Sequence, residues 1–247
     1  MKLSYTEDGR TREVDLYTKE GLEELARVWL KASCQHRLMY EPTWLGVPII
    51  QYPEDIVMMQ ELIWKLRPDV IVETGVAHGG SAILYGSVLE VLGKGHVIGI
   101  DIEIRQYNKV AIKSHPMSKR ITLVEGSSVD PAVFARVREL VGGCESVLVV
   151  LDSNHSYEHV REEMRLYSQL VPADGYLVVM DGAQALMSDI PRGKAEWRQD
   201  NPLRAIEEFV AASSDWEPDP HYNRLLITSS PRGYLRRKRR PSPPAGA

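Results

Sequence analysis

The chain of 247 residues has little cysteine and no long apolar run. Its two cysteines, Cys34 and Cys144, are too few for a disulfide framework, and we expect both thiols to be buried or half-buried in a reducing compartment. No apolar stretch approaches the roughly 20 residues that a membrane helix requires. Residues 1–8 also lack the apolar core of an export signal, so we expect a cytoplasmic protein without a membrane span.

The sequence has no large excess of charge of either sign. A net charge of −4 gives no general reason to bind nucleic acid. Residues 236–240 read Arg-Arg-Lys-Arg-Arg, and we expect residues 239–247 to be a disordered, solvated tail. The length allows one large core, which we assign to residues 55–238. We expect residues 1–54 to form a helical and loop segment that contributes to the ligand pocket.

Two common phosphate-binding motifs are absent. There is no Gly-x-x-x-x-Gly-Lys-Ser/Thr loop. The dinucleotide motif Gly-x-Gly-x-x-Gly fails at its second glycine, because residues 75–80 read Gly-Val-Ala-His-Gly-Gly. An NAD(P)-dependent reductase therefore remains only an alternative, and it also lacks a Tyr-x-x-x-Lys dyad beside the strand predicted at 147–151.

The most informative stretch is a predicted strand, loop and helix at residues 70–92. A β-branched apolar run ends at Glu73, three glycines follow (Gly75, Gly79 and Gly80), and an apolar helix-compatible segment begins at Ser81. Glycine lets the backbone approach a ligand closely. The carboxylate of Glu73 repels pyrophosphate and attracts an ammonium group. The pattern thus favours a cofactor with an amino-acid end, such as S-adenosylmethionine (SAM).

Strand and helix signals alternate along most of the chain and predict an α/β fold. A parallel, doubly wound, Rossmann-like sheet with helices on both faces and closing antiparallel strands fits this order, and its ligands lie beyond the carboxyl ends of the strands. The predicted strands are 70–73, 96–101, 121–124, 147–151, 176–180, 224–228 and 233–236. The predicted helices are 18–36, one that opens near Pro53, 81–92, 106–114, 131–141, 157–170 and 202–212.

Polar residues follow the second and third strands of this predicted sheet. The carboxylate of Asp101 suits the hydroxyls of a ribose, and Ser127 or Ser128 offers a hydroxyl or amide to an adenine edge. Taken singly, Asp101 and Ser128 are equally well explained as helix N-caps. Together with Glu73 they form an ordered set of strand ends, which is more specific.

The densest chemical signal lies at residues 149–159. Asp152 ends a strand, and His155 follows three residues later. Methyl transfer to a hydroxyl requires a base, and an imidazole is suitable near neutral pH. Asp152 and Asp181, each at a strand end, offer the oxygen ligands that Mg²⁺ prefers. We expect His159, one helical turn later, to face solvent, and His78 either to contact the ligand or to be exposed.

These residues identify a resemblance. The chain resembles the SAM-dependent O-methyltransferases of the cephalosporin hydroxylase/rhamnosyl O-methyltransferase family and, more distantly, macrolide-sugar and catechol O-methyltransferases. The resemblance covers roughly residues 35–238 and rests on segments 71–81, 97–101, 125–128, 148–155, 201–202, 225–228 and 233–237. It implies a Rossmann-like class I methyltransferase that forms a homo-oligomer.

The resemblance also implies roles for the candidate residues. Members that bind magnesium carry two adjacent acidic or amide ligands after the fifth strand, where this chain has Met180 and Asp181. A thioether is a poor ligand for a hard cation, so weakened Mg²⁺ binding is expected. The implied roles are the methionine portion of SAM for Glu73, Gly75 and Ser81, the ribose for Asp101, the adenine region for Ser127 and Ser128, a metal ligand for Asp152, and the general base for His155.

The acceptor side is less well defined. Residues 182–202 form a long connection without a clean period, which is typical of a lid or binding loop. Trp197, Arg192 and Arg198 suit a sugar, glycoside or specialised metabolite, and Tyr40 and Trp44 can close the opposite side, although core packing explains both tryptophans equally well. The alternative to catalysis is a SAM-binding partner subunit.

Overall fold

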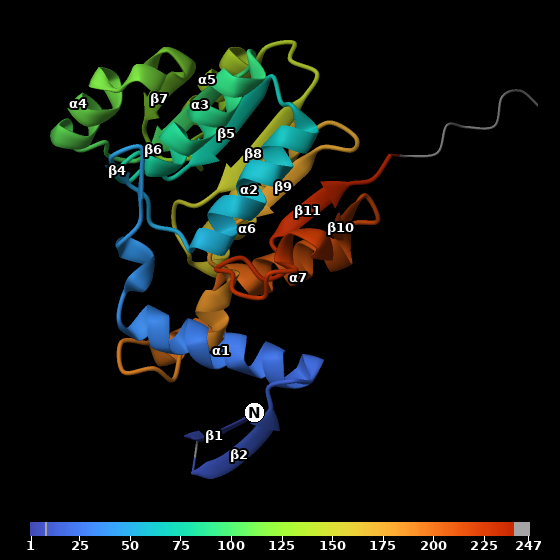
Figure 1. The fold of residues 1–247 in the computed structure, drawn as a ribbon. Coiled ribbons are helices and arrows are strands. Elements are labelled where there is room, and N and C mark those ends of the chain that lie inside the picture. Colours follow the sequence, from blue (N-terminus) through green and yellow to red (C-terminus); the bar gives the residue numbers. More distant parts are fainter. Residues whose placement is uncertain (8, 240–247) are drawn as a thin grey trace, which may run out of the picture.

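The computed structural model describes residues 1–7 and 9–239 (Figure 1). The predicted tail at 239–247 therefore lies, except for its first residue, outside the described residues. The chain begins with a two-stranded hairpin and a long helix that together stand below the main sheet in Figure 1. These first elements are β1 (Lys2–Glu7), β2 (Arg10–Asp15), α1 (Lys19–Gln35), β3 (Thr43–Trp44), β4 (Val47–Pro48) and α2 (Pro53–Leu66).

Strands and helices then alternate, as the sequence predicts. The five predicted parallel strands are confirmed, with ends within one residue. The elements are β5 (Val70–Thr74), α3 (Gly80–Leu92), β6 (His96–Asp101), α4 (Gln106–Ser114), β7 (Ile121–Glu125), α5 (Pro131–Val141), β8 (Val147–Leu151), α6 (Tyr157–Tyr167), β9 (Tyr176–Val179), α7 (Pro202–Ala212), β10 (Trp216–Pro218) and β11 (Tyr234–Arg237).

β5 is the middle one of the five parallel strands in the main sheet. In the described residues its strand order is β10-β11-β9-β8-β5-β6-β7. β5 pairs in parallel with both β6 and β8, and β11 and β10 close one edge in antiparallel pairing. The chain runs outward from β5 through β6 and β7, and then returns to β8 on the other side. A ligand crevice forms at such a switch point in parallel sheets.

Two apolar layers cover the sheet. Val70 and Val72 of β5 pack in a cluster with residues of α5, α6 and α7. Ile71, between them, packs in a second cluster with residues of α2 and α3. This alternation follows from the two-residue repeat of a strand. Because both faces are covered, every residue of β5 is buried, which explains its uninterrupted apolar, β-branched sequence before Glu73.

The predicted strand at 224–228 is wrong. Leu226 has a left-handed backbone (φ 69°), and the segment forms turns instead. The buried carboxylate of Asp55 on α2 accepts hydrogen bonds from the Thr228 hydroxyl (2.5 Å) and from the backbone N–H of Ser229 (2.7 Å). The apolar pattern is typical of a strand, but Thr228 and Ser229 at its end form hydrogen bonds to α2 and do not join the sheet. The second antiparallel strand is Trp216–Pro218, which the sequence reasoning missed.

The contact between Asp55 and Thr228 gives a testable stability effect. Burial raises the pKa of Asp55 to about 6, and its remaining charge depends on these donors. Thr228→Val removes one donor, and we expect the free energy of unfolding in urea at pH 7 to fall by about 1–3 kcal/mol. Thr43→Val, at an exposed position, is the matched control and should change it by less than about 0.5 kcal/mol. Equal effects would show that the Thr228 hydroxyl has no such role.

Two expectations from composition have different outcomes. Cys34 is half-buried, as expected, whereas Cys144 is exposed, because it lies in the turn that follows α5. In the described part of the chain, no helix combines the length and hydropathy that a membrane span requires.

Candidate active site

The glycine loop after β5 is shaped by close backbone contacts. Gly75 has φ +90°, and a Cβ at this position would lie 1.9 Å from the carbonyl oxygen of Asp152. A Cβ on Gly80 would lie 2.3 Å from the carbonyl oxygen of Pro48. Only glycine therefore fits where this loop meets the end of β8 and the segment before α2. The absence of Cβ atoms here lets the backbones of three segments pack closely together.

A cavity of about 540 Å³ lies above this loop. This volume is in the range of small-molecule binding sites. Its lining comes from the glycine loop and Ser81, the residues after β8 and β9, the segment between α1 and α2, and the segment that joins β9 to α7. We call this last part, residues 180–201, the β9–α7 segment. The loop, Asp152, His155 and Asp181 thus border one cavity.

Glu73 lies beside Ser81, below the loop. Its side chain is completely buried, and neither carboxylate oxygen has a hydrogen-bond partner among the described residues. Burial is the main cause that raises the pKa of Glu73 to about 8, and the charge of Asp152 adds to it. A buried carboxylate without a donor is costly, whereas an ammonium group would satisfy it. The site therefore fits the amino-acid end of SAM.

Asp152, His155 and Asp181 meet at the mouth of the cavity. His155 Nε2 lies 3.0 Å from Asp181 Oδ2 and 3.7 Å from Asp152 Oδ1. One ligand atom from each residue lies within 4.8 Å of the others. Burial lowers the pKa of His155, but the two carboxylates outweigh it and raise the pKa to about 9. Two carboxylates and an imidazole in this arrangement can hold a divalent cation or orient a base.

Met180 does not contribute to this cluster. Its side chain is buried, and its sulfur accepts a hydrogen bond from the Ser230 hydroxyl at 3.2 Å. Asp181 follows in a left-handed conformation (φ 57°), which turns the chain sharply after β9. The carboxylates that can bind a cation here are therefore those of Asp152 and Asp181.

The predicted adenosine-binding residues lie outside the described cavity lining. Asp101 Oδ2 accepts the backbone N–H groups of Val76 (2.9 Å) and Ala77 (3.0 Å), so it stabilises the glycine loop. The Ser127 carbonyl accepts the N–H of Asp130 (3.0 Å). The ribose and adenine roles of Asp101, Ser127 and Ser128 stay predictions.

His159 and His78 differ in their surroundings. His159 is half-buried and not the solvent-facing residue that was predicted, because its Nε2 lies 3.1 Å from the Ser128 hydroxyl and 3.2 Å from the Ser153 hydroxyl. The ends of β7 and β8 approach this face of α6, which the helical repeat alone does not reveal. His78 lines the cavity and lies 3.4 Å from Asn108 Oδ1.

The predicted acceptor residues divide into two groups. Trp197, Arg192 and Tyr40 line the cavity. Arg198 instead donates to the Ser188 hydroxyl (3.2 Å), and Trp44 donates from its indole nitrogen to the Ser87 hydroxyl (3.0 Å). Further lining residues that the sequence reasoning missed include Cys34, Arg37, Gln51, Tyr52 and Met187. Except for Cys34, which lies near the end of α1, they come from segments without a periodic signal.

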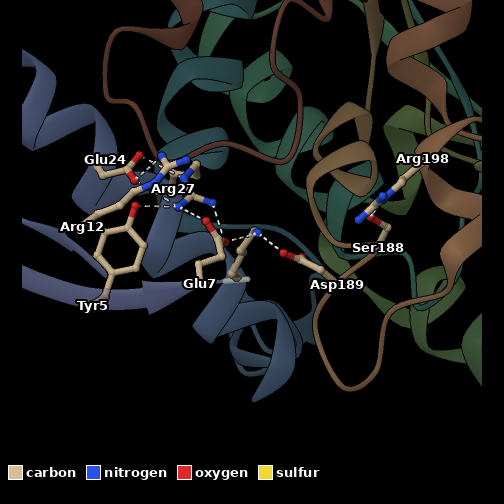
Figure 2. Close-up of polar contacts among 9 residues, drawn as sticks. Tyr5, Glu7, Arg12, Glu24, Arg27, Ser188, Asp189 and Arg198 are labelled. Atoms are coloured by element: carbon tan, nitrogen blue, oxygen red, sulfur yellow. Dashed lines mark hydrogen bonds and ion pairs between the residues drawn. The ribbon is translucent and has the colours of Figure 1, made fainter. Parts of the chain in front are cut away.

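Charged residues attach the β9–α7 segment to the N-terminal hairpin (Figure 2). Arg27 on α1 donates to both carboxylate oxygens of Glu7, at 2.9 and 2.8 Å. Lys31, one turn later, contacts Glu7 at 2.7 Å and Asp189 at 2.5 Å. Each partly exposed pair contributes little alone, on the order of 1 kcal/mol or less. Together they hold one wall of the cavity against α1.

Comparison with known proteins agrees with this geometry. The family model of rhamnosyl O-methyltransferase/CmcI matches residues 36–238. The rhamnosyl O-methyltransferase of Mycobacterium leprae is 29% identical over 200 residues, which cover 79% of this chain and 83% of the relative. That of Mycobacterium bovis is 28% identical over 200 residues, with 78% and 77% covered.

Solved structures show the same fold. An apo structure of CmcI matches with a TM-score of 0.60 at 22% identity and covers 81% of this chain and 78% of CmcI. A structure of CmcI with Mg and SAM matches with a TM-score of 0.58 at 23% identity, with 80% and 77% covered. The family is one of O-methyltransferases, which decides against the two alternatives that the sequence left open, an NAD(P)-dependent reductase and a non-catalytic SAM-binding subunit. The chain belongs to the rhamnosyl O-methyltransferase/CmcI family and is a SAM-dependent O-methyltransferase.

Proposed function

We propose that this enzyme methylates a hydroxyl of a sugar or glycoside, with His155 as the general base. The observation that carries the proposal is that His155 borders the same cavity as the glycine loop. The relatives named above are rhamnosyl O-methyltransferases, and Trp197 and Tyr40 give the cavity the aromatic surfaces on which sugar rings pack.

The proposed chemistry requires one proton acceptor. When bound, SAM would supply an electrophilic methyl group on a sulfonium, and S-adenosylhomocysteine (SAH) would be its demethylated form. His155 takes the hydroxyl proton while the hydroxyl oxygen bonds to the methyl carbon and the carbon–sulfur bond breaks. The products are a methyl ether, the neutral thioether SAH and an imidazolium. Asp181, 3.0 Å from the ring, orients the imidazole and stabilises its charge.

We also propose that Asp152 and Asp181 hold Mg²⁺, which would lower the pKa of the acceptor hydroxyl when bound. Chelation with EDTA should then lower turnover at least about tenfold, and Mg²⁺ should restore it. Asp181→Asn should weaken Mg²⁺ binding in calorimetry. Asp174→Asn is the control, since Asp174 has a similar left-handed backbone but precedes β9, at the opposite end of the strand from Asp181 and outside the cavity. If neither EDTA nor added Mg²⁺ changes turnover, Mg²⁺ has no role in the reaction.

The N-terminal residues belong to this proposal. We propose that residues 1–54 form part of the ligand pocket and that residues 55–238 form the methyltransferase domain. Support comes from the lining residues between positions 34 and 52, and from the contact of Lys31 with Asp189 across the cavity wall.

Methyl transfer to defined acceptors tests the proposed function. We would supply labelled SAM and compare rhamnosides, other neutral glycosides and a phenolic non-sugar acceptor. Methylation of a glycoside, located by mass spectrometry, is the expected result. Methylation of the phenol alone would overturn the sugar assignment.

A further inference from the structure

Unsatisfied buried polar atoms concentrate below the glycine loop. Among the described residues, eight buried side-chain nitrogen and oxygen atoms lack a hydrogen-bond partner. Five of these eight belong to only three residues: both amide atoms of Gln51, both carboxylate oxygens of Glu73 and the Tyr85 hydroxyl. Native proteins leave few such atoms unpaired. A group of five indicates a site that is completed by something other than the chain.

The three side chains come from different elements but form one cluster. Gln51 precedes α2 and is 3% exposed, Glu73 is in β5, and Tyr85 lies in α3, one turn after Ser81. The hydroxyl groups of Ser81 and Tyr85 are near enough to Glu73 to lower its pKa, against the larger effect of burial, but neither meets the geometry of a hydrogen bond to its carboxylate. The amide of Gln51 likewise lowers the pKa of the Tyr85 hydroxyl, against the larger effect of burial. The cluster therefore runs continuously from Glu73 to Gln51.

The cluster adjoins the cavity at two points. Gln51 and Ser81 both line it, whereas the lining does not include Glu73 or Tyr85. The missing partner must therefore enter from the cavity and meet Gln51 and Ser81 first. A buried polar group without a partner is destabilising, so a ligand that pairs these groups gains affinity.

The chemistry of the cluster defines the partner. The carboxylate of Glu73 needs a donor, and an ammonium group is the strongest one. The amide of Gln51 supplies a donor and an acceptor side by side. A group with an ammonium and a carboxylate on one carbon matches both needs. The methionine end of SAM is such a group.

We propose that Gln51 and Tyr85 complete the subsite for the amino-acid end of the cofactor. Gln51 contacts that end directly, and Tyr85 is a positioning residue that orients the carboxylate of Glu73. This inference rests on SAM as the cofactor of the enzyme class, but not on the identity of the acceptor. Failure to methylate a sugar would therefore leave it intact.

Two ligands separate this role from a purely structural one. SAH carries the amino-acid end, whereas 5′-methylthioadenosine shares the adenosine and the sulfur but lacks that end. Both would be titrated by calorimetry against the wild type and against Gln51→Leu, Gln51→Met and Tyr85→Phe. Gln169→Leu, at an exposed position in the turn that follows α6, is the matched control.

The proposal predicts a selective loss. Both Gln51 variants should raise the Kd for SAH about 10–100-fold and change the Kd for methylthioadenosine less than twofold. Tyr85→Phe should raise the Kd for SAH about 3–10-fold. Without ligand, the Gln51 variants should melt no lower than the wild type, because they remove an unpaired buried amide. Equal weakening of both ligands, or unchanged SAH binding in both Gln51 variants, would overturn the proposal.

Discussion

His155→Gln is expected to lower kcat for methyl transfer by about 10²–10⁴-fold while the Kd for SAH stays within about threefold of the wild-type value. Glutamine has a polar side chain of similar length, but it cannot take the proton from the hydroxyl that is methylated. Because the carboxylates of Asp152 and Asp181 surround the imidazole, the substitution also removes the group that they orient. Cofactor binding should persist, since Glu73 and the glycine loop are untouched.

The pH dependence of the same enzyme gives an independent check. A general base acts only when deprotonated, and the pKa of His155 is raised to about 9. Without added Mg²⁺, which would offset the two carboxylates that raise this pKa, the kcat of the wild type should therefore rise with pH between about 7 and 9, and the residual activity of His155→Gln should lack this rise. His221→Gln, at an exposed position outside the cavity, is the control and should match the wild type. A full rate in His155→Gln would remove His155 from the reaction.

Gly75→Ala is expected to destabilise the protein by about 2–5 kcal/mol and to abolish measurable SAH binding. The added Cβ would lie 1.9 Å from the carbonyl oxygen of Asp152, and the backbone at φ +90° strains any other residue. The clash can be relieved only if the ends of β5 and β8 separate. That movement would distort the glycine loop (residues 75–80) and displace Asp152 from His155.

Gly93→Ala provides the matched control for this effect. Gly93 also has a positive φ (+73°), but a Cβ there meets nothing within 4 Å. Backbone strain alone should then cost about 1–2 kcal/mol, with SAH affinity unchanged. Urea denaturation and calorimetric titration of the two variants measure the difference. If Gly75→Ala and Gly93→Ala lose the same stability and bind SAH alike, the contact with Asp152 is not what requires glycine.

The catalytic cluster could be predicted from sequence because parallel strands impose their own geometry. Asp152 and Asp181 follow β8 and β9, which pair in parallel, so their carboxyl ends lie at one edge of the sheet. His155 is only three residues from Asp152, and a short loop keeps it there. Nothing beyond the strand assignments was needed to bring these three side chains together.

Other parts of the site depended on contacts that no local pattern contains. Gln51 lies in a proline-rich segment without periodicity, and it enters the site because Pro48 packs against Gly80 at the start of α3. His159 is half-buried beside Ser128 and Ser153, which lie at two different strand ends.

The amino-acid sequence by itself determined the order of strands and helices, the glycine loop and the carboxylates at the strand ends. These follow from apolar repeats and backbone constraints that act over a few residues. Tertiary structure alone decided that Thr228 binds Asp55 rather than continuing a strand, that Met180 turns its sulfur toward Ser230, and that Lys31 reaches Asp189. Each of these contacts joins residues 50 or more positions apart in the chain, where packing of whole elements, not local preference, sets the distance between side chains.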